Sequence, residues 1–477
     1  MINQTTRRNF MNTLGLGAAG MTVAANCAAQ SKRPNVLFIA VDDLRPQVGC
    51  YGFEQMKSPN IDRIANEGVL FKRAYCNVPV CGASRASLMT GLRPGRDFYW
   101  DFLTNSDKDR PGNLSLPRYL RENGYYTISN GKIYHHLNDG AGSWSEDAWR
   151  PKYPSSRGYA LEENRNIEKT YEEKVGPAYE KADVPDNGYK DGMVADKTIE
   201  DLQRLAKMDQ PFFLAAGFMK PHLPFNAPAK YWDMYKPEDI DLADNPFEPT
   251  DAPKESIHNW GELRKYYGIP QKGNMPEDLA RDLVHGYYAC VSYTDAQIGR
   301  LLDELDRLNL RDNTIVILWG DHGWNLGEHT LWCKHCCYNT SLQTPMLLSA
   351  PGYKQGVQTQ ALTEFVDIYP TLAELCGLPI PEHCEGVSMK PLMENPDRPW
   401  KEAVYTRWKQ GESIRTDRYL YTEFFDKNWQ VVSRMLYDHV KDPQENVNIA
   451  RHADNRALVE KLSAMLHDNY SAARVMN

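Results

Sequence analysis

The stretch Asn35-Val36-Leu37-Phe38-Ile39-Ala40-Val41 decides the fold of this chain. Its unbroken apolar character after Asn35 is typical of a strand that is buried on both faces of a parallel sheet. Two further runs of this kind cover residues 211–218 and 314–319. Helical patterns lie between or beside these runs, at 60–67, 116–123, 195–206 and 279–308. Strands that alternate with helices predict an α/β fold, in which helices sandwich a large, mainly parallel sheet.

Polar side chains follow each predicted strand. Asp42-Asp43 comes directly after the first strand, Asp321-His322 follows the last one, and His222 lies a few residues beyond the middle one. Functional sites of such sheets form at the carboxyl ends of the strands. One acidic pair alone would more often cap a turn, but two pairs at matching positions crowd carboxylates that a bound cation would neutralise. The oxygen ligands suit Ca²⁺ or Mg²⁺, while His322 adds a nitrogen ligand that calcium uses less often.

The chain of 477 residues is long enough for one large domain with an appendage. The sequence pattern changes near Pro379, beyond which we predict short strands at 405–408, 413–416 and 418–423 and a polar helix at 453–468. We therefore predict a main domain at 31–378 and a smaller α+β subdomain at 379–477. Residues 139–186 are expected to form a long surface excursion at the rim of a pocket.

Charge and the amino terminus narrow the functional classes. The formal net charge of −8 gives no reason to expect nucleic-acid binding, so an anionic substrate would need a local cluster of cationic groups. Residues 1–30 are predicted to be a signal peptide, because Arg7-Arg8 precedes a short apolar run as in twin-arginine signals; a disordered basic tail is the alternative. Cys27 is a candidate lipidation site, although Asn26 fits that motif poorly. We expect an exported protein, periplasmic or extracellular, without a transmembrane span.

Ten cysteines are present, and in an exported protein some of them can pair. The run Cys333-Lys334-His335-Cys336-Cys337 resembles half of a zinc site, but no second pair of Cys or His follows at a suitable spacing. A structural or disulfide role is therefore the favoured interpretation of these cysteines.

The segment Val78-Pro79-Val80-Cys81-Gly82-Ala83-Ser84-Arg85-Ala86-Ser87-Leu88-Met89-Thr90-Gly91 carries the most chemical information. Cys81 precedes Arg85 and the start of a helix, where backbone N–H groups and a guanidinium would hold an anion. Considered by itself, Cys81 is either a thiolate nucleophile or an inert buried cysteine.

The part from Cys81 to Gly91 resembles the signature of the sulfatase family, with Ala83 where proline is commoner. Residues 124–135 resemble a second sulfatase signature, in which Lys132 and His135 match and Asn130 departs from the pattern. Further matches to the family lie before and after these two signatures, in the family's order, at 42–43, 220–225, 320–323, 326–329, 334 and 366–372. Within the family, His322 and the segments 220–225 and 323–329 look most similar to the iduronate-2-sulfatase subgroup.

The resemblance implies an alkaline-phosphatase-like fold, a catalytic role for residues 31–378, and one calcium ion per chain. It implies a maturation enzyme that oxidises Cys81 to formylglycine. The implied calcium ligands are Asp42, Asp43, Cys81, Asp321 and His322. The implied catalytic residues are Cys81, Arg85, Lys132, His135, His222 and Lys334.

The family's chemistry gives each implied catalytic residue a role. Arg85 would orient the formylglycine hydrate and stabilise the oxygen that attacks sulfur, and Lys132 and Lys334 would hold the sulfate. His222 and Lys334 would face the leaving oxygen, and His135 would accept the proton of the second hydroxyl group when sulfate is expelled. The hydrate thereby divides one difficult hydrolysis into two easier steps.

The leading functional hypothesis is an exo-acting sulfatase that removes sulfate from a saccharide containing uronic acid, such as 2-O-sulfated iduronate in a glycosaminoglycan fragment. One alternative is a sulfatase of an algal polysaccharide such as ulvan or carrageenan. Others are a phosphoester or phosphonate hydrolase of the same superfamily, and a glycan-binding pseudoenzyme that lacks the modification. Arg93, Arg96, Asp97, Trp100 and Asp101 are expected to shape the substrate pocket.

Overall fold

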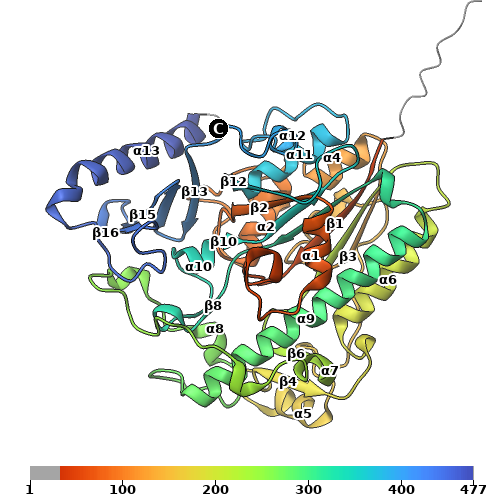
Figure 1. The fold of residues 1–477 in the computed structure, drawn as a ribbon, viewed down its shortest axis with the longest axis horizontal. Coiled ribbons are helices and arrows are strands. Elements are labelled where there is room, and N and C mark those ends of the chain that lie inside the picture. Colours follow the sequence, from red (N-terminus) through yellow and green to blue (C-terminus); the bar gives the residue numbers. More distant parts are fainter. Residues whose placement is uncertain (1–32, 476–477) are drawn as a thin grey trace, which may run out of the picture. The chain divides into compact units, whose positions relative to one another are not determined.

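A mixed, mostly parallel sheet forms the core of the computed structural model, which describes residues 33–475 (Figure 1). Its strands follow the order β10-β2-β11-β7-β1-β5-β3, and β12 pairs with β2. The three predicted strands are neighbours, because β1 (Asn35–Val41) lies between β5 (Phe212–Phe218) and β7 (Thr314–Gly320) and is parallel to both. The other strands are β2 (Val69–Tyr75), β3 (Tyr126–Gly131), β10 (Gln343–Thr344), β11 (Met346–Ser349) and β12 (Val357–Glu364). The predicted fold class is thus confirmed.

Alternate residues of β1 pack into cores on opposite faces of the sheet. Leu37, Ile39 and Val41 belong to a core with α1, α6 and α9, whereas Val36 and Phe38 belong to a core with α2, α4, α11 and α12. Burial on both faces explains why this strand has no polar alternation. The helices are α1 (Pro59–Asn66), α2 (Cys81–Thr90), α4 (Leu116–Glu122), α6 (Lys190–Leu205), α9 (Glu277–Arg307), α11 (Ile368–Leu375) and α12 (Lys390–Glu394).

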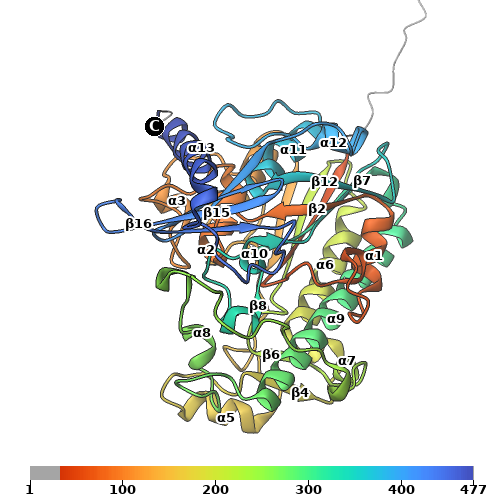
Figure 2. The same ribbon diagram turned by 60° about the vertical axis from the view of Figure 1, so that its left-hand side comes forward.

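A second, antiparallel sheet follows in the sequence, with strand order β13-β14-β15-β16, and α13 packs beside it (Figures 1 and 2). Its elements are β13 (Ala403–Trp408), β14 (Gly411–Thr416), β15 (Tyr419–Phe425), β16 (Val431–Asp438) and α13 (Arg456–Val475). Leu392 and Met393 of α12 still belong to the core of the main sheet. The proposed division at residue 379 stays a prediction.

The predicted excursion at 139–186 contains regular structure. It includes α5 and β4, and β4 pairs in parallel with β6 in a two-stranded sheet, shown at the bottom of Figure 2. The shorter elements are α3 (Ser106–Asp109), α5 (Glu162–Thr170), α7 (Ala229–Trp232), α8 (Gly261–Arg264), α10 (Asn339–Leu342), β4 (Tyr179–Ala182), β6 (Phe225–Pro228), β8 (Asn325–Leu326) and β9 (Trp332–Cys333).

The predicted signal peptide and Cys27 lie outside the described residues. Between residues 33 and 475, no helix is both long and apolar enough to cross a bilayer. The nine cysteines in this range are all free thiols, so the expectation that some of the cysteines pair finds no support here. Cys333, Cys336 and Cys337 are buried in hydrophobic clusters, which agrees with the structural interpretation of the run at 333–337.

Candidate active site

Four neighbouring strands of the main sheet end at one edge, and the residues that follow them form a single cluster. Asp42-Asp43 follows β1, Asp321-His322 follows β7, Lys132 follows β3, and His222 lies four residues beyond β5. The strands are adjacent in the order β7-β1-β5-β3 and run parallel, so their carboxyl ends bring these side chains together.

Cys81 is the first residue of α2 and points into this cluster. Its Sγ lies 3.3 Å from Nε2 of His322 and 3.8 Å from Oδ1 of Asp43. A Cβ on Gly82 would lie 2.6 Å from the backbone oxygen of Phe102, so glycine is needed where the helix begins. Burial, reinforced by the charge of Asp42, raises the pKa of the Cys81 thiol well above its usual value. An unmodified Cys81 would therefore be a protonated thiol and a poor nucleophile.

Arg85 lies one turn further along α2 and joins two strand ends. Its Nε lies 2.9 Å from Oδ2 of Asp321, and its Nη2 lies 3.0 Å from Oδ1 of Asp42. Its remaining nitrogen donates to the backbone oxygens of Lys132 and Ile133. The guanidinium is fully buried, and the nearby charges of Asp321 and Asp42 outweigh burial and raise its pKa. Arg85 therefore fixes the carboxylates relative to α2.

Two lysines complete the inner surface of the cluster. The ammonium of Lys132 donates to Oδ2 of Asp42, and that of Lys334 lies 3.2–3.3 Å from both oxygens of Asp43. Burial alone would lower both lysine pKa values, but the neighbouring carboxylates raise them. Lys334 also lies 4.8 Å from the centre of the Trp324 ring. Both lysines are therefore cationic and available to an anion that enters between them.

Two histidines, His222 and His135, lie near the charged groups of this cluster. Nε2 of His222 lies 3.2 Å from Oε1 of Glu262 and 3.9 Å from Oδ2 of Asp43. His135 is half-buried, and its Nδ1 has no hydrogen-bond partner. Burial, followed by the charge of Lys132, lowers the pKa of His135 to about 2. His135 is therefore a neutral imidazole that can accept a proton.

The turn that carries Asp43 has an unusual backbone conformation. Asp43 has φ 59°, in the left-handed region, and its N–H donates to Oδ1 of Asp321 at 2.9 Å. The hydroxyl of Tyr287, from α9, donates to the backbone oxygen of Asp43 at 2.9 Å and accepts from the N–H of Arg45 at 3.0 Å. The long helix thus holds the turn in place through two hydrogen bonds to its backbone.

The predicted metal ligands fit a hard divalent cation. Side-chain ligand atoms of Asp42, Asp43, Cys81 and His222 lie within 4.8 Å of one another, as do those of Cys81, Asp321 and His322. The five predicted ligands are divided between these two groups, and Cys81 belongs to both. Burial and the charge of Asp42 raise the pKa of Asp321, which is the crowding that a cation relieves. Carboxylate oxygens suit calcium or magnesium.

The predicted pocket residues Arg93 and Arg96 have other partners. Arg93 forms a two-point ion pair with Glu364, with N–O distances of 2.6 and 3.0 Å, and Arg96 forms one with Glu412 at 2.7 and 2.9 Å. Both glutamate side chains are fully buried. These arginines therefore join the segment after α2 to β12 and β14, which their sequence positions gave no reason to expect.

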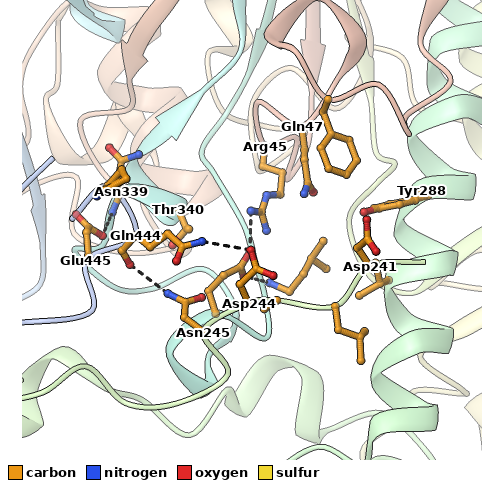
Figure 3. A pocket seen from close by; sticks show the side chains of 17 residues that line it. Arg45, Gln47, Asp241, Asp244, Asn245, Tyr288, Asn339, Thr340, Gln444 and Glu445 are labelled. Atoms are coloured by element: carbon orange, nitrogen blue, oxygen red, sulfur yellow. Dashed lines mark hydrogen bonds and ion pairs between the residues drawn. The ribbon is translucent and has the colours of Figure 1, made fainter. Parts of the chain in front are cut away.

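A separate cavity of about 410 Å³ lies beyond Arg45, and Figure 3 shows the polar side chains that line it, including Asp241, Asp244 and Gln444. Arg45 lies 2.7 Å from Glu328 there. None of the predicted site residues lines this cavity, so the clustered groups at the sheet edge are the candidate active site.

Two residues of the cluster were not predicted from the sequence. Glu262 belongs to a stretch without a recognisable motif, and Tyr287 lies in the middle of a helical apolar pattern. In neither case does the sequence contain a feature that would have singled the residue out.

Comparison with known proteins identifies the class. The sulfatase family model matches residues 34–378, and a model of the C-terminal region of N-sulphoglucosamine sulphohydrolase matches residues 327–472. Iduronate 2-sulfatase of Mus musculus is 32% identical over 95% of this chain and 97% of its own length. The human iduronate 2-sulfatase is 34% identical over 78% of this chain and 74% of its own length. An ulvan-active sulfatase of Formosa agariphila is 29% identical over 91% of this chain and 80% of its own length.

Solved structures agree on the fold. A protein in complex with its substrate D-glucosamine-2-N,6-O-disulfate aligns with TM-score 0.75 at 22% identity, over 93% of this chain and 98% of that chain. A phosphonate monoester hydrolase of Agrobacterium radiobacter aligns with TM-score 0.73 at 22% identity, over 92% of this chain and 96% of that chain. The chain belongs to the sulfatase family. It is a sulfuric ester hydrolase, and the sulfatase resemblance of its motifs is confirmed.

Proposed function

We propose that this chain is an exported, calcium-dependent sulfatase whose residue 81 is converted to formylglycine by a maturation enzyme. The observation that carries the proposal is the position of Cys81, which meets Asp43 and His322 at the start of a helix while remaining a protonated thiol. A residue in this place acts as a nucleophile only after its side chain has been changed.

The charges in the cluster support a bound divalent cation. Four carboxylates, those of Asp42, Asp43, Asp321 and Glu262, face three cationic side chains, those of Arg85, Lys132 and Lys334. A cluster that is negative overall would repel a sulfate ester. Calcium, when bound, would reverse the sign and draw electron density from the sulfate oxygens. We assign it to Asp42, Asp43, Asp321, His322 and residue 81.

The chain's own side chains then have distinct tasks. Arg85 holds the nucleophilic side chain and its carboxylate neighbours in place, and Lys132 and Lys334 bind the sulfate oxygens. His222 and Lys334 lie on the side of the leaving oxygen, where a proton or positive charge is needed as the ester bond breaks. His135, being neutral, receives the proton that must be removed before sulfate leaves. Formylglycine supplies a geminal diol, which offers an exit that a serine ester lacks.

The substrate that we propose is a 2-O-sulfated iduronate at the end of a glycosaminoglycan fragment, attacked in an exo manner. The mouse and human iduronate 2-sulfatases, at 32% and 34% identity, support this choice. An algal polysaccharide such as ulvan or carrageenan is the alternative, supported by the ulvan-active relative at 29% identity. Phosphoester or phosphonate hydrolysis ranks below both, because the likeness to the phosphonate hydrolase is one of fold.

The proposed cellular setting completes the assignment. Residues 1–30 would direct export through a twin-arginine-like signal, to the periplasm or the cell exterior, and Cys27 would allow a lipid anchor. Residues 31–378 would form the catalytic domain and residues 379–477 the C-terminal subdomain.

A screen of defined sulfated disaccharides, with calcium present and after chelation, tests the proposal. We expect sulfate release from 2-O-sulfated iduronate, little release from other positions, and loss of activity on chelation that calcium restores. A matched phosphate ester serves as the counter-substrate. Faster hydrolysis of the phosphate ester, or full activity after chelation, would overturn the assignment.

A further inference from the structure

Glu262 is the one carboxylate of the cluster that has no role in the proposed mechanism. Its side chain is 22% exposed and lies on the single-turn helix α8. Its Oε1 accepts from the ammonium of Lys334 at 2.9 Å, and its Oε2 lies 2.8 Å from the same nitrogen. Oε1 also lies 3.2 Å from Nε2 of His222. Glu262 therefore contacts both residues that face the leaving oxygen.

The contacts of His222 show what Glu262 does to the imidazole ring. Nδ1 lies 2.6 Å from the backbone oxygen of Leu223, which can only accept, so Nδ1 must carry a hydrogen. Nε2 faces two carboxylates, Glu262 at 3.2 Å and Asp43 at 3.9 Å. Glu262 is the nearer of the two, so the ring has a close contact at each of its nitrogens. The ring is thus held from both ends.

Lys334 is shared between two carboxylates in the same way. Its ammonium lies 3.2–3.3 Å from the oxygens of Asp43 and 2.8–2.9 Å from those of Glu262. Asp43 is a proposed metal ligand, so without Glu262 the ammonium would be drawn towards the metal side of the cluster. Burial would raise the pKa of Glu262, but the charge of Lys334 and the contact with His222 hold it well below its usual value. Glu262 is therefore a permanent anion.

The backbone that carries Glu262 is fixed by its own contacts. The guanidinium of Arg264 lies 3.4 Å from the centre of the Trp260 ring and donates to the backbone oxygens of Asn259, Pro270 and Gly273. The N–H of Trp260 donates to Nδ1 of His258 at 2.9 Å. These contacts hold α8 in one position, so its carboxylate can define the position of its partners.

We propose that Glu262 is a positioning residue, which holds His222 and Lys334 together on the leaving-group side of the reaction centre. The inference rests on the proposed function, in which these two residues assist departure of the sugar oxygen. Positioning matters most when the leaving group is a poor one, because a sugar alkoxide needs a proton or a cation and 4-nitrophenolate needs much less.

The test compares Glu262→Ala, Glu262→Gln and a control, Glu255→Gln, with the wild-type enzyme. Glu255 lies in the same stretch of chain on an exposed surface, where it accepts from Ser433. The kcat and KM values are measured with a 2-O-sulfated iduronate disaccharide and with 4-nitrophenyl sulfate. Thermal unfolding of each variant checks that the fold is retained, and the near-isosteric Gln variant provides a second opportunity if the Ala variant does not fold.

For the disaccharide we expect kcat of Glu262→Ala to fall about 10- to 100-fold with KM within about threefold of wild type. Glu262→Gln should give a kcat between those of Glu262→Ala and the wild type, because its amide oxygen can still accept hydrogen bonds but the negative charge that attracts Lys334 is lost. For 4-nitrophenyl sulfate, kcat should stay within about threefold. Glu255→Gln should behave as wild type with both esters.

If kcat of Glu262→Ala fell by the same factor with the disaccharide and with 4-nitrophenyl sulfate, the inference would be overturned. A change confined to KM and shared by the Ala and Gln variants would also overturn it, because that result would mean that only the charge of Glu262 matters. A wild-type enzyme that releases sulfate from neither probe would instead overturn the proposed function, and the inference with it.

Discussion

At the scale of single residues, the cluster places charged groups where water does not reach them. Arg85 and Asp42 are fully buried and neutralise each other. Asp321 gives Arg85 a second partner, and Lys132 gives Asp42 one. Burial alone would raise the pKa of Asp42, but Lys132 and Arg85 lower it well below its usual value. Burial, reinforced by the charge of Asp42, raises the pKa of the Cys81 thiol, so the buried charge of Asp42 also affects the chemistry of its neighbour.

His135 leads to a prediction about pH and stability. Its pKa is about 2 in the folded chain against 6.5 for a free imidazole, so between these values the unfolded chain binds a proton that the folded chain does not. Stability therefore falls as the pH falls below about 6.5, by about 2 kcal/mol for this group between pH 7 and pH 5. Urea unfolding of the wild type and of His135→Gln at both pH values measures it.

Between pH 7 and pH 5, the free energy of unfolding of His135→Gln should fall by about 1–2 kcal/mol less than that of the wild type. If both proteins lost the same amount, His135 would not be the neutral, buried base that its surroundings indicate.

At the scale of elements, the site depends on a helix that carries none of the predicted ligands. Tyr287 of α9 binds the backbone on both sides of the turn at Asp43, and that turn has a left-handed residue at its centre. Supporting hydrogen bonds of this kind hold ligand oxygens in the geometry that a metal needs.

We predict that Tyr287→Phe weakens calcium binding about 10- to 100-fold, because the turn at Asp43 loses the hydroxyl that fixes it. Calorimetric titration of metal-free protein measures the affinity without relying on activity. Tyr288→Phe is the matched control, since Tyr288 lines the separate cavity beyond Arg45 and should leave calcium affinity unchanged. Equal affinities of Tyr287→Phe and wild type would show that the turn is stable without this contact.

The elements that the sequence revealed are those with a strong local pattern. The strands β1, β5 and β7 could be recognised because burial on both faces of the sheet requires a continuous run of apolar residues. The helix α9 could be recognised because burial along one stripe requires apolar residues at helical spacing over a long segment. β16 was not recognised, because its first half alternates between partly buried and exposed residues. The pairing of β11 between β2 and β7 depends on residues far apart in the chain, which no local pattern encodes.

At the scale of the whole molecule, the residues of the site come from most of the chain's length. The predicted metal and catalytic residues could be brought together from motifs, because most of them lie within a few residues of a strand end, while Cys81 and Arg85 belong to the signature that forms α2. Glu262 could not, since only the folded chain places α8 beside Lys334. The ion pairs of Arg93 and Arg96 could not be predicted for the same reason, because their buried partners Glu364 and Glu412 lie more than 270 residues away in the sequence. Their expected place at the substrate pocket stays a prediction.

The overall charge shows the same contrast between local and global properties. The chain is acidic as a whole, at a formal −8, yet cationic side chains converge on residue 81 at the edge of the sheet. On the proposed assignment, an anionic substrate is attracted by Lys132, Lys334 and a bound calcium ion, and not by the molecule as a whole.

The central claim is that residue 81 acts only after oxidation, and the mass of its peptide from purified, active protein tests it most directly. We predict a peptide roughly 18 Da lighter than the cysteine form, as expected for formylglycine, in a preparation that releases sulfate, and no activity in Cys81→Ala. A preparation that hydrolyses sulfate esters while residue 81 is entirely unmodified cysteine would contradict the account.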